Sequence, residues 1–346
     1  MEGTKLFSRC YGDESNKKDR AIVFIHGGPG ANSWAFQMSS AKRLARRNYY
    51  VVVYDQYGCG RSRSEDMNDD PAGHNVGSAI QDLLGVIEEH GLRSPTLVGH
   101  SWGGFLSLKF LEKHPKVVKG VVIVCSPIDY PEAFYNILTQ VHQIYDGMRS
   151  LLRMKAFPRT REIEKLKNKM FPFRTQKEGV TTRKPHLDRI MDESYDFKGH
   201  DVTKVFEHAR MLDFSTPINL LLNPEYRGLT DKLASLDDSE WFLDFDEEVG
   251  GHFFNNELCD KPGVVCMLEK NNIGLIRQHR SRVHAIYSDG DRMFSTRQVE
   301  CIRGVLPRRH FSYVYGAGHY PFLEQNGEFL DVLTRHLERI QKVELS

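Results

Sequence analysis

Short apolar runs alternate with amphipathic segments in the first part of this chain, and each apolar run ends in a polar or glycine-rich cluster. Short buried runs rich in β-branched residues, separated by helical periodicity, are typical of a parallel sheet covered by helices on both faces. Open sheets of this kind bind ligands beyond the carboxyl ends of their strands, where the polar clusters fall. The sequence therefore predicts an α/β fold with its site at that edge. The predicted strands are residues 21–25, 50–54, 96–98, 121–125, 283–287 and 311–315.

The segment between the two groups of predicted strands has a different character. Residues 127–278 combine helical stretches, helix breakers and blocks of charge, without a strand run of comparable strength. We interpret this region as a mainly helical cap domain inserted into one core, which residues 1–126 and 279–346 form. A chain of 346 residues with 40% hydrophobic residues is long enough to bury such a core.

Charge and cysteine content argue against several classes of function. The formal net charge of +1 gives no field of one sign that would attract nucleic acid or an anionic membrane. The cysteines form no CxxC pair, which favours reduced thiols over a zinc site, so we expect no metal and no cofactor. Without a signal-like or membrane-spanning stretch, we expect a cytoplasmic protein whose partner is a small molecule or small peptide. The six cysteines are Cys10, Cys59, Cys125, Cys259, Cys266 and Cys301.

The strongest chemical signal is a GxSxG pentapeptide centred on Ser101. It lies between a predicted strand and an amphipathic segment, which is the context of a nucleophile elbow in an α/β-hydrolase fold. The glycines at either side leave room for the strand and the helix to approach each other. The pentapeptide alone matches many glycine-rich turns, but this context favours Ser101 as a nucleophile.

A serine hydroxyl needs a base to remove its proton, and this fold supplies an acid and then a histidine late in the chain. His319 follows the last predicted strand in a glycine-rich turn, and this position distinguishes it among the 15 histidines. The preceding strand ends in Ser288-Asp289-Gly290-Asp291. We predict Asp291 as the acid, while Asp289 stays open as a turn residue or as the acid itself.

Acyl transfer also needs two N–H donors for the tetrahedral oxyanion. One donor is normally the residue after the nucleophile, and the other lies in the loop after an early strand. The backbone N–H groups of Trp102 and Gly28 meet this description. An ordinary glycine-proline turn is the alternative for residues 26–30.

Three motifs together resemble the proline iminopeptidases (prolyl aminopeptidases). They are HGGPG at residues 26–30, DQYGCGRS at 55–62 and GHSWGG at 99–104. The resemblance covers residues 21–127 and 283–324, and it implies an α/β-hydrolase that removes an N-terminal residue, typically proline, from a short peptide. The chain departs from the family at Tyr57, where arginine is usual, and at Ser288, where glycine is common.

An aminopeptidase must hold the ammonium group of its substrate, and carboxylates do this through charge-assisted hydrogen bonds. Between Lys232 and Lys261 the chain has no lysine or arginine and many acidic residues. By the family resemblance, a glutamate before residues 252–255 is the candidate ligand of the amine. We rank Glu248 first, Glu247 second and Glu207 third, and a solvated surface role is the alternative for each.

Two other classes of function stay open at this point. The same serine, acid and histidine suit an esterase, lactonase or amidase whose substrate has no free amine. A catalytically silent binding protein is disfavoured, because every part of the predicted triad and oxyanion loop is present. An epoxide hydrolase would need a carboxylate where Ser101 stands.

Overall fold

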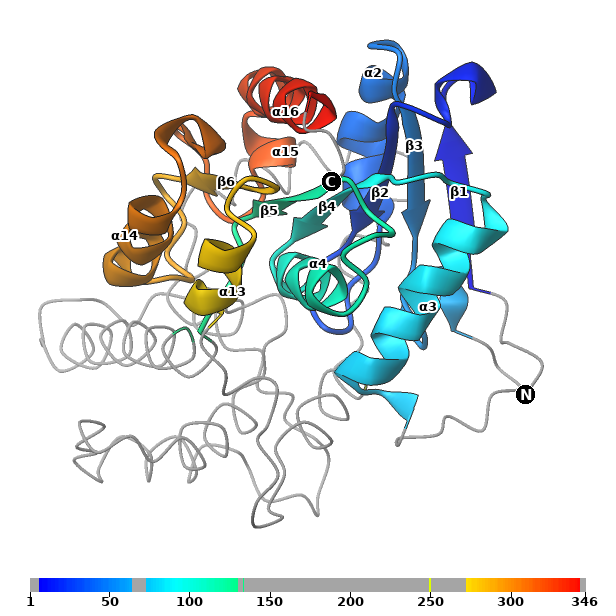
Figure 1. Cartoon of the computed structure of the whole chain (residues 1–346), viewed down its shortest axis with the longest axis horizontal. Coiled ribbons are helices and arrows are strands. Elements are labelled where there is room, and N and C mark those ends of the chain that lie inside the picture. The colour runs from blue at the N-terminus through cyan, green and yellow to red at the C-terminus, as the bar shows by residue number, and fades with distance from the viewer. Residues whose placement is uncertain (1–5, 64–72, 130–132, 134–248, 250–271, 343–346) are drawn as a thin grey trace, which may run out of the picture.

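The computed structural model describes residues 6–63, 73–129, 133, 249 and 272–342. Within them a single seven-stranded sheet forms the centre of the fold, in the order β1-β3-β2-β4-β5-β6-β7 (Figure 1). Strand β1 pairs antiparallel with β3, and every other pair is parallel. The mostly parallel α/β fold predicted from the sequence is confirmed. The strands are β1 (Ser8–Tyr11), β2 (Ala21–Ile25), β3 (Tyr50–Tyr54), β4 (Thr96–His100), β5 (Gly120–Val124), β6 (Val283–Ser288) and β7 (Phe311–Val314).

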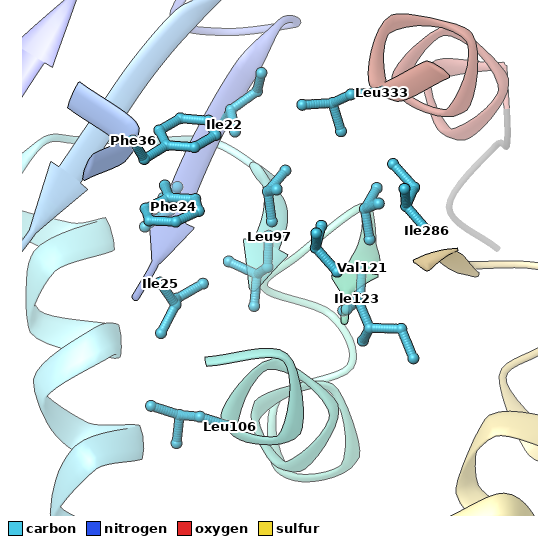
Figure 2. Packing of buried hydrophobic residues seen from close by; sticks show 14 of the residues in the cluster. Ile22, Phe24, Ile25, Phe36, Leu97, Leu106, Val121, Ile123, Ile286 and Leu333 are labelled. Atoms are coloured by element: carbon cyan, nitrogen blue, oxygen red, sulfur yellow. The ribbon is translucent and has the colours of Figure 1, made fainter. Parts of the chain in front are cut away.

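Helices cover both faces of the sheet. Leu333 of α16 and Leu106 of α4 lie on opposite sides of the strand residues, as Figure 2 shows. Helix α3 packs beside α4, whereas α15 lies with α16 and α1 on the other face. The longer helices of the described part are α3 (Val76–Glu89), α4 (Trp102–Lys113), α14 (Thr296–Val305) and α16 (Asn326–Gln341). The shorter segments are α1 (Trp34–Phe36), η2 (Gln37–Ala41), α2 (Lys42–Ala45), α13 (Ile273–Gln278) and α15 (Pro321–Glu324), with η1 (Glu14–Asn16), η3 (Gly60–Ser62) and η6 (Arg308–His310).

Local sequence explains where helix α3 begins and which face it buries. The Asn75 side chain accepts a hydrogen bond from Ser78 N at 2.8 Å and so caps the first turn. Apolar residues recur at helical spacing and are buried against the core, among them Ile80, Leu83 and Ile87.

The strands in the middle of the sheet are buried on both faces. Every residue of β2, β3, β4 and β5 is buried, which explains why these strands read as continuous apolar runs. The Phe24 ring of β2 stacks on Phe36 with centroids 3.8 Å apart, and Phe322 of α15 packs edge-on at 5.9 Å from Phe24. Helix α15, which closely follows His319, therefore packs against β2, the first predicted strand.

The sequence did not predict strand β1. Its residues, Ser8 to Tyr11, include Arg9 and Cys10, both exposed, so neither face carries an apolar pattern. The strand exists because it pairs with the edge of β3, in the register Ser8 with Tyr54. Such pairing is a long-range interaction that local sequence does not encode.

The predicted domain boundaries stay predictions. Most of the proposed cap, residues 134–248 and 250–271, lies outside the described residues. Helix α13, at the end of the proposed cap, contacts α4 and α14 and buries Ile276. Within the described part, Cys10, Cys59, Cys125 and Cys301 are free thiols. The helices of the described part include none with the length and hydropathy of a membrane span.

Three histidines are buried together at the far side of the sheet from β1. His284 of β6 and His336 of α16 have their Nδ1 atoms 2.8 Å apart, and His310 stacks on His284 with centroids 3.8 Å apart. Burial lowers the pKa of His284 to about 2 and that of His336 to about 3, and it lowers the pKa of His310 as well. All three are therefore neutral in the folded protein at neutral pH.

This cluster predicts that the protein loses stability in mild acid. The unfolded chain binds protons at these histidines below about pH 6.5. The folded chain resists protonation chiefly because the rings are buried, and also because Arg309, Arg335 and Arg339 add positive charge nearby. The free energy of unfolding should fall by up to about 1.4 kcal/mol per pH unit for each histidine as pH drops below about 6.5. Urea unfolding at pH 7.5, 6.5 and 5.5 measures this slope. His336→Gln should reduce the dependence of the free energy of unfolding on pH by about the contribution of one histidine. An unchanged slope would show that His336 does not contribute to the loss of stability in acid.

Candidate active site

Ser101 occupies a sharp turn between β4 and α4. Its φ of 52° and ψ of −120° are rare for a residue with a side chain, and the surrounding contacts must hold it there. Ser101 N donates to Val124 O at 2.9 Å, and Ser101 O accepts from Gly104 N at 2.9 Å. A Cβ atom at Gly99 would collide with the Gly103 carbonyl, so the turn needs glycine there. The Ser101 side chain is partly exposed at the carboxyl edge of the sheet.

His319 and Asp291 meet in the loops that follow β7 and β6. His319 Nδ1 lies 2.9 Å from Asp291 Oδ2, with the two side chains 4% and 2% exposed. Because an ionised carboxylate only accepts, Nδ1 carries the proton, and Nε2 of the neutral ring is left as an acceptor. Asp291 Oδ1 accepts from Met293 N at 2.9 Å, which fixes the carboxylate. This is the arrangement in which an imidazole can remove a proton.

The second aspartate of this loop has a different partner. Asp289 Oδ1 accepts from Gly316 N at 2.7 Å, in an exposed position. Asp289 therefore links the loop after β6 to the loop after β7, while Asp291 contacts the imidazole itself. Of the two aspartates that the sequence left open, Asp291 lies at the imidazole and Asp289 at the backbone of Gly316, and the role of the acid stays a prediction.

The turn at Ser101 and the loop at His319 are in direct contact. His100 Nε2 donates to His319 O at 2.7 Å, and the two rings have centroids 4.7 Å apart. Burial lowers the pKa of His100 well below its usual range, and His319 lowers it further, so His100 is neutral. The residue next to Ser101 thus holds the backbone of His319, and the structure brings the ends of β4, β6 and β7 to one edge.

The loop that contains Gly28 lies against the turn at Ser101. A Cβ atom at Gly27 would be 3.1 Å from Ser101 Cβ. Gly28 has a φ of +117°, and a Cβ atom there would collide with the backbone nitrogens of Gly30 and Ala31. Trp102, the other predicted N–H donor, is the first residue of α4, where the helix dipole favours developing negative charge.

A buried glutamine connects the motifs of this site. Gln56 N donates to His26 Nε2 at 2.9 Å, and Gln56 Nε2 donates to His26 O at 3.1 Å. Gln56 Oε1 in turn accepts from Trp102 Nε1 at 2.9 Å. Burial lowers the pKa of His26. This effect is larger than the opposite effect of the Asp55 charge, so the ring is neutral. Gln56 belongs to the motif at residues 55–62, and its position just after a strand is the one sequence signal that points to a role.

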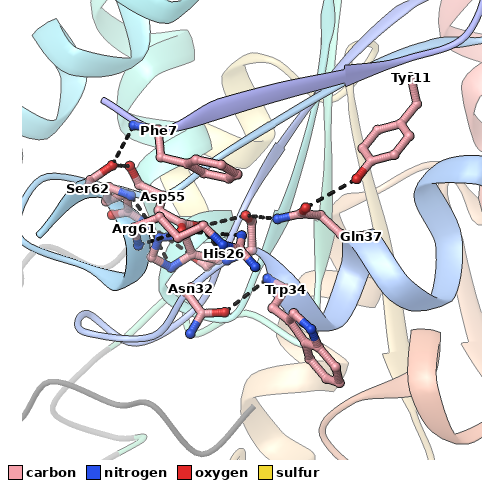
Figure 3. A network of polar contacts seen from close by, with 11 residues as sticks. Phe7, Tyr11, His26, Asn32, Trp34, Gln37, Asp55, Arg61 and Ser62 are labelled. Atoms are coloured by element: carbon pink, nitrogen blue, oxygen red, sulfur yellow. Dashed lines mark hydrogen bonds and ion pairs between the residues drawn. The ribbon is translucent and has the colours of Figure 1, made fainter. Parts of the chain in front are cut away.

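Asp55 organises the neighbouring loops and is fully buried (Figure 3). Its Oδ1 accepts from Ser33 N at 2.8 Å and from Ser33 Oγ at 2.5 Å. Its Oδ2 accepts from Arg61 N at 3.0 Å, and its carbonyl accepts from Ser62 Oγ at 2.6 Å. This carboxylate joins the segments that begin α1 and η3, so it supports the loops around the candidate site.

The three glutamates predicted to bind an amine, Glu207, Glu247 and Glu248, lie outside the described residues. Val249, the next residue in the chain after Glu248, is buried, and its Cγ2 lies 3.1 Å from where a Cβ on Gly58 would stand. Gly58 belongs to the loop that follows β3 and Asp55. Among the described residues, no cluster of three histidine, cysteine or acidic side chains could hold a metal ion.

Comparison with known proteins agrees with this architecture. Residues 20–166 match the model of the α/β-hydrolase fold. A proline iminopeptidase of Mycobacterium smegmatis superposes with a TM-score of 0.58 at 16% identity, covering 97% of this chain and 95% of that one. The chain has the α/β-hydrolase fold. A carboxylesterase structure from the thaumarchaeon Nitrososphaera gargenis gives 0.55 at 14% identity, covering 99% and 98%. At these identities, the likeness of this chain to both structures concerns the fold.

The sequence relatives extend the comparison for part of the chain. The chain is 31% identical to a proline iminopeptidase of Lactobacillus crispatus over 122 residues, which are 35% of this chain and 40% of that protein. A proline iminopeptidase of Neisseria meningitidis is 32% identical over 125 residues, 34% of this chain and 38% of that one. The chain therefore aligns with less than half the length of these relatives. The resemblance to proline iminopeptidases that the motifs indicated is confirmed.

Proposed function

We propose that this protein is a serine hydrolase that releases an N-terminal proline, or a similar small residue, from short peptides. The hydrogen bond between Asp291 and His319, at 2.9 Å beside the turn that carries Ser101, is the observation that supports it most. The acid orients the imidazole and stabilises the imidazolium that forms when it accepts a proton. No metal or cofactor takes part in this scheme.

The proposed reaction has two stages. Ser101 Oγ attacks the carbonyl carbon of the substrate while His319 Nε2 takes its proton, and the oxyanion accepts hydrogen bonds from the N–H groups of Gly28 and Trp102. The tetrahedral intermediate collapses to an acyl-enzyme, and His319 gives the proton to the departing amine. A water molecule then attacks the acyl group with His319 as its base, which releases the N-terminal residue and restores Ser101.

Recognition of the substrate amine is proposed for the acidic segment at Glu247 and Glu248, with Glu207 as a third candidate. The buried position of Val249 against the loop at Gly58 supports this, because Glu248 precedes Val249 directly in the chain. A carboxylate there would pair with the ammonium group of a free N-terminus. Residues 127–278 would form the cap that carries this segment.

A substrate comparison tests the proposal. Proline p-nitroanilide should be hydrolysed with a kcat/KM about tenfold or more above that of its N-acetylated form, since a charged hydrogen bond contributes about 1.5–3 kcal/mol. Glu248→Gln should raise KM for the free substrate and leave the reaction of Ser101 with a fluorophosphonate unchanged. Glu257→Gln, from the same acidic segment, is the matched control and should behave as the wild type.

An esterase, lactonase or amidase is the second candidate function. The fold superposes on a carboxylesterase nearly as well as on a proline iminopeptidase, and the proposed triad itself requires no amine on the substrate. Equal rates on free and N-acetylated substrates, combined with a much faster reaction of p-nitrophenyl acetate and no effect of Glu248→Gln, would favour this second function over the first.

A further inference from the structure

His319 lies in a loop between β7 and the short helix α15, so no regular element fixes its backbone. A base in a loop must still be held to within about half an ångström for efficient proton transfer. The Asp291 carboxylate restrains the imidazole at Nδ1 only. The contacts of the peptide groups around His319 therefore decide how well the ring is placed.

One carboxylate binds the backbone N–H groups of the two residues that flank His319. Glu324 Oε2 accepts from Gly318 N at 2.7 Å, and Glu324 Oε1 accepts from Tyr320 N at 2.9 Å. Glu324 N also donates to Tyr320 O at 3.0 Å, which closes the single turn of α15 and points the side chain back at the loop. The two N–H groups that flank His319 are thus bound by the two oxygens of one side chain.

The carbonyl oxygen of His319 is held from the opposite direction. The His319 carbonyl accepts from His100 Nε2 at 2.7 Å, and His100 is the residue before Ser101. The loop is thereby fixed between Glu324 on α15 and His100 at the end of β4. Phe322 of α15 packs edge-on against His100, with centroids 4.9 Å apart, which anchors α15 to the same place.

We propose that Glu324 is a positioning residue. It holds the His319 imidazole in the place from which the ring can contact both Asp291 and Ser101. This inference rests on the proposed function, because it gives His319 the role of base. Both oxygens of Glu324 must accept, and only an ionised carboxylate has two acceptor oxygens without a donor. Burial raises the pKa of Glu324, whereas the two N–H groups and the nearby His319 ring favour its charged form.

Glu324→Gln is the informative substitution, because it keeps the shape of the side chain. The amide nitrogen would face one of the two N–H groups and repel it, so the loop would lose one bond and shift. Glu328→Gln is the matched control, since Glu328 is exposed in the first turn of α16. The probe is an alkyl fluorophosphonate, whose reaction with Ser101 needs the base but no particular cap residue.

The inactivation kinetics separate positioning from binding. For Glu324→Gln we expect the maximal inactivation rate constant to fall about tenfold to a hundredfold, while the half-saturating probe concentration stays within about twofold of wild type. Glu328→Gln should match the wild type in both. A change confined to the half-saturating concentration, or a wild-type rate constant in Glu324→Gln, would overturn the positioning role.

A second variant covers the case in which Glu324→Gln does not fold. Glu324→Asp keeps the charge but is too short to reach both N–H groups, so its rate constant should also fall while its thermal unfolding stays close to that of wild type. A wild-type rate constant in a folded Glu324→Asp would overturn the proposal. If the wild type labels only through Ser101 and the Glu324 variants react normally, positioning fails and the proposed function stands. If Ser101→Ala still labels, the proposed function fails as well.

Discussion

Replacing Ser101 with alanine should abolish turnover, with a loss in kcat of about 10⁴-fold or more. The alanine side chain has no nucleophilic atom at the turn between β4 and α4, where the structure holds residue 101 at a φ of 52°. His319→Ala should produce a loss of similar size, because the members of a triad act as a unit. Initial rates on proline p-nitroanilide and p-nitrophenyl acetate measure both losses.

Controls must show that the loss in kcat of Ser101→Ala comes from the missing nucleophile and not from unfolding of the protein. Ser39→Ala serves as the control, since Ser39 lies on η2 and is only partly buried. It should keep the wild-type rate, and the thermal unfolding of Ser101→Ala should remain close to that of wild type. Turnover by a folded Ser101→Ala protein within tenfold of wild type would remove Ser101 from the role of nucleophile.

Asp291→Asn should lower kcat by about 10⁴-fold, because an amide in place of the carboxylate favours the wrong tautomer of the imidazole and removes the charge that stabilises imidazolium. Asp289→Asn should leave kcat near that of wild type. The amide oxygen at residue 289 can still accept from Gly316 N, which the carboxylate contacts at 2.7 Å. The kcat values of the two variants on one aryl ester provide the comparison.

These two aspartates form a matched pair, since they flank Gly290 in the same loop. Similar losses in the two variants, or a larger loss in Asp289→Asn, would transfer the acid role to Asp289. The 2.9 Å contact between Asp291 and His319 predicts the opposite order.

The sequence predicted the parts of this fold that carry their own local signal. The central strands are buried on both faces, so their apolar runs are visible without knowledge of the fold. Strand β1 has no such pattern, and only its pairing with β3 reveals it. Chain order and a strand before each loop were the grounds for choosing His319 and for ranking Asp291 above Asp289, and the roles of these residues stay predictions.

The supporting residues of the site were harder to predict. Gln56 and Glu324 act through hydrogen bonds to His26, Trp102 and the loop at His319, and their partners are far away in the sequence or on the backbone. A polar side chain gives no sequence signal of such a partner. The glutamates proposed to bind an amine, Glu207, Glu247 and Glu248, lie outside the described residues, so their role stays a prediction.

We propose that chemistry occurs at Ser101 with His319 as its base, and the other roles in the site depend on this assignment. The most direct measurement is to treat the wild-type protein with a fluorophosphonate and to locate the adduct by mass spectrometry of its peptides. We expect one adduct per chain, on Ser101, and a far slower reaction in His319→Ala. An adduct on another residue, or no adduct on a folded wild-type protein, would show that Ser101 is not the nucleophile.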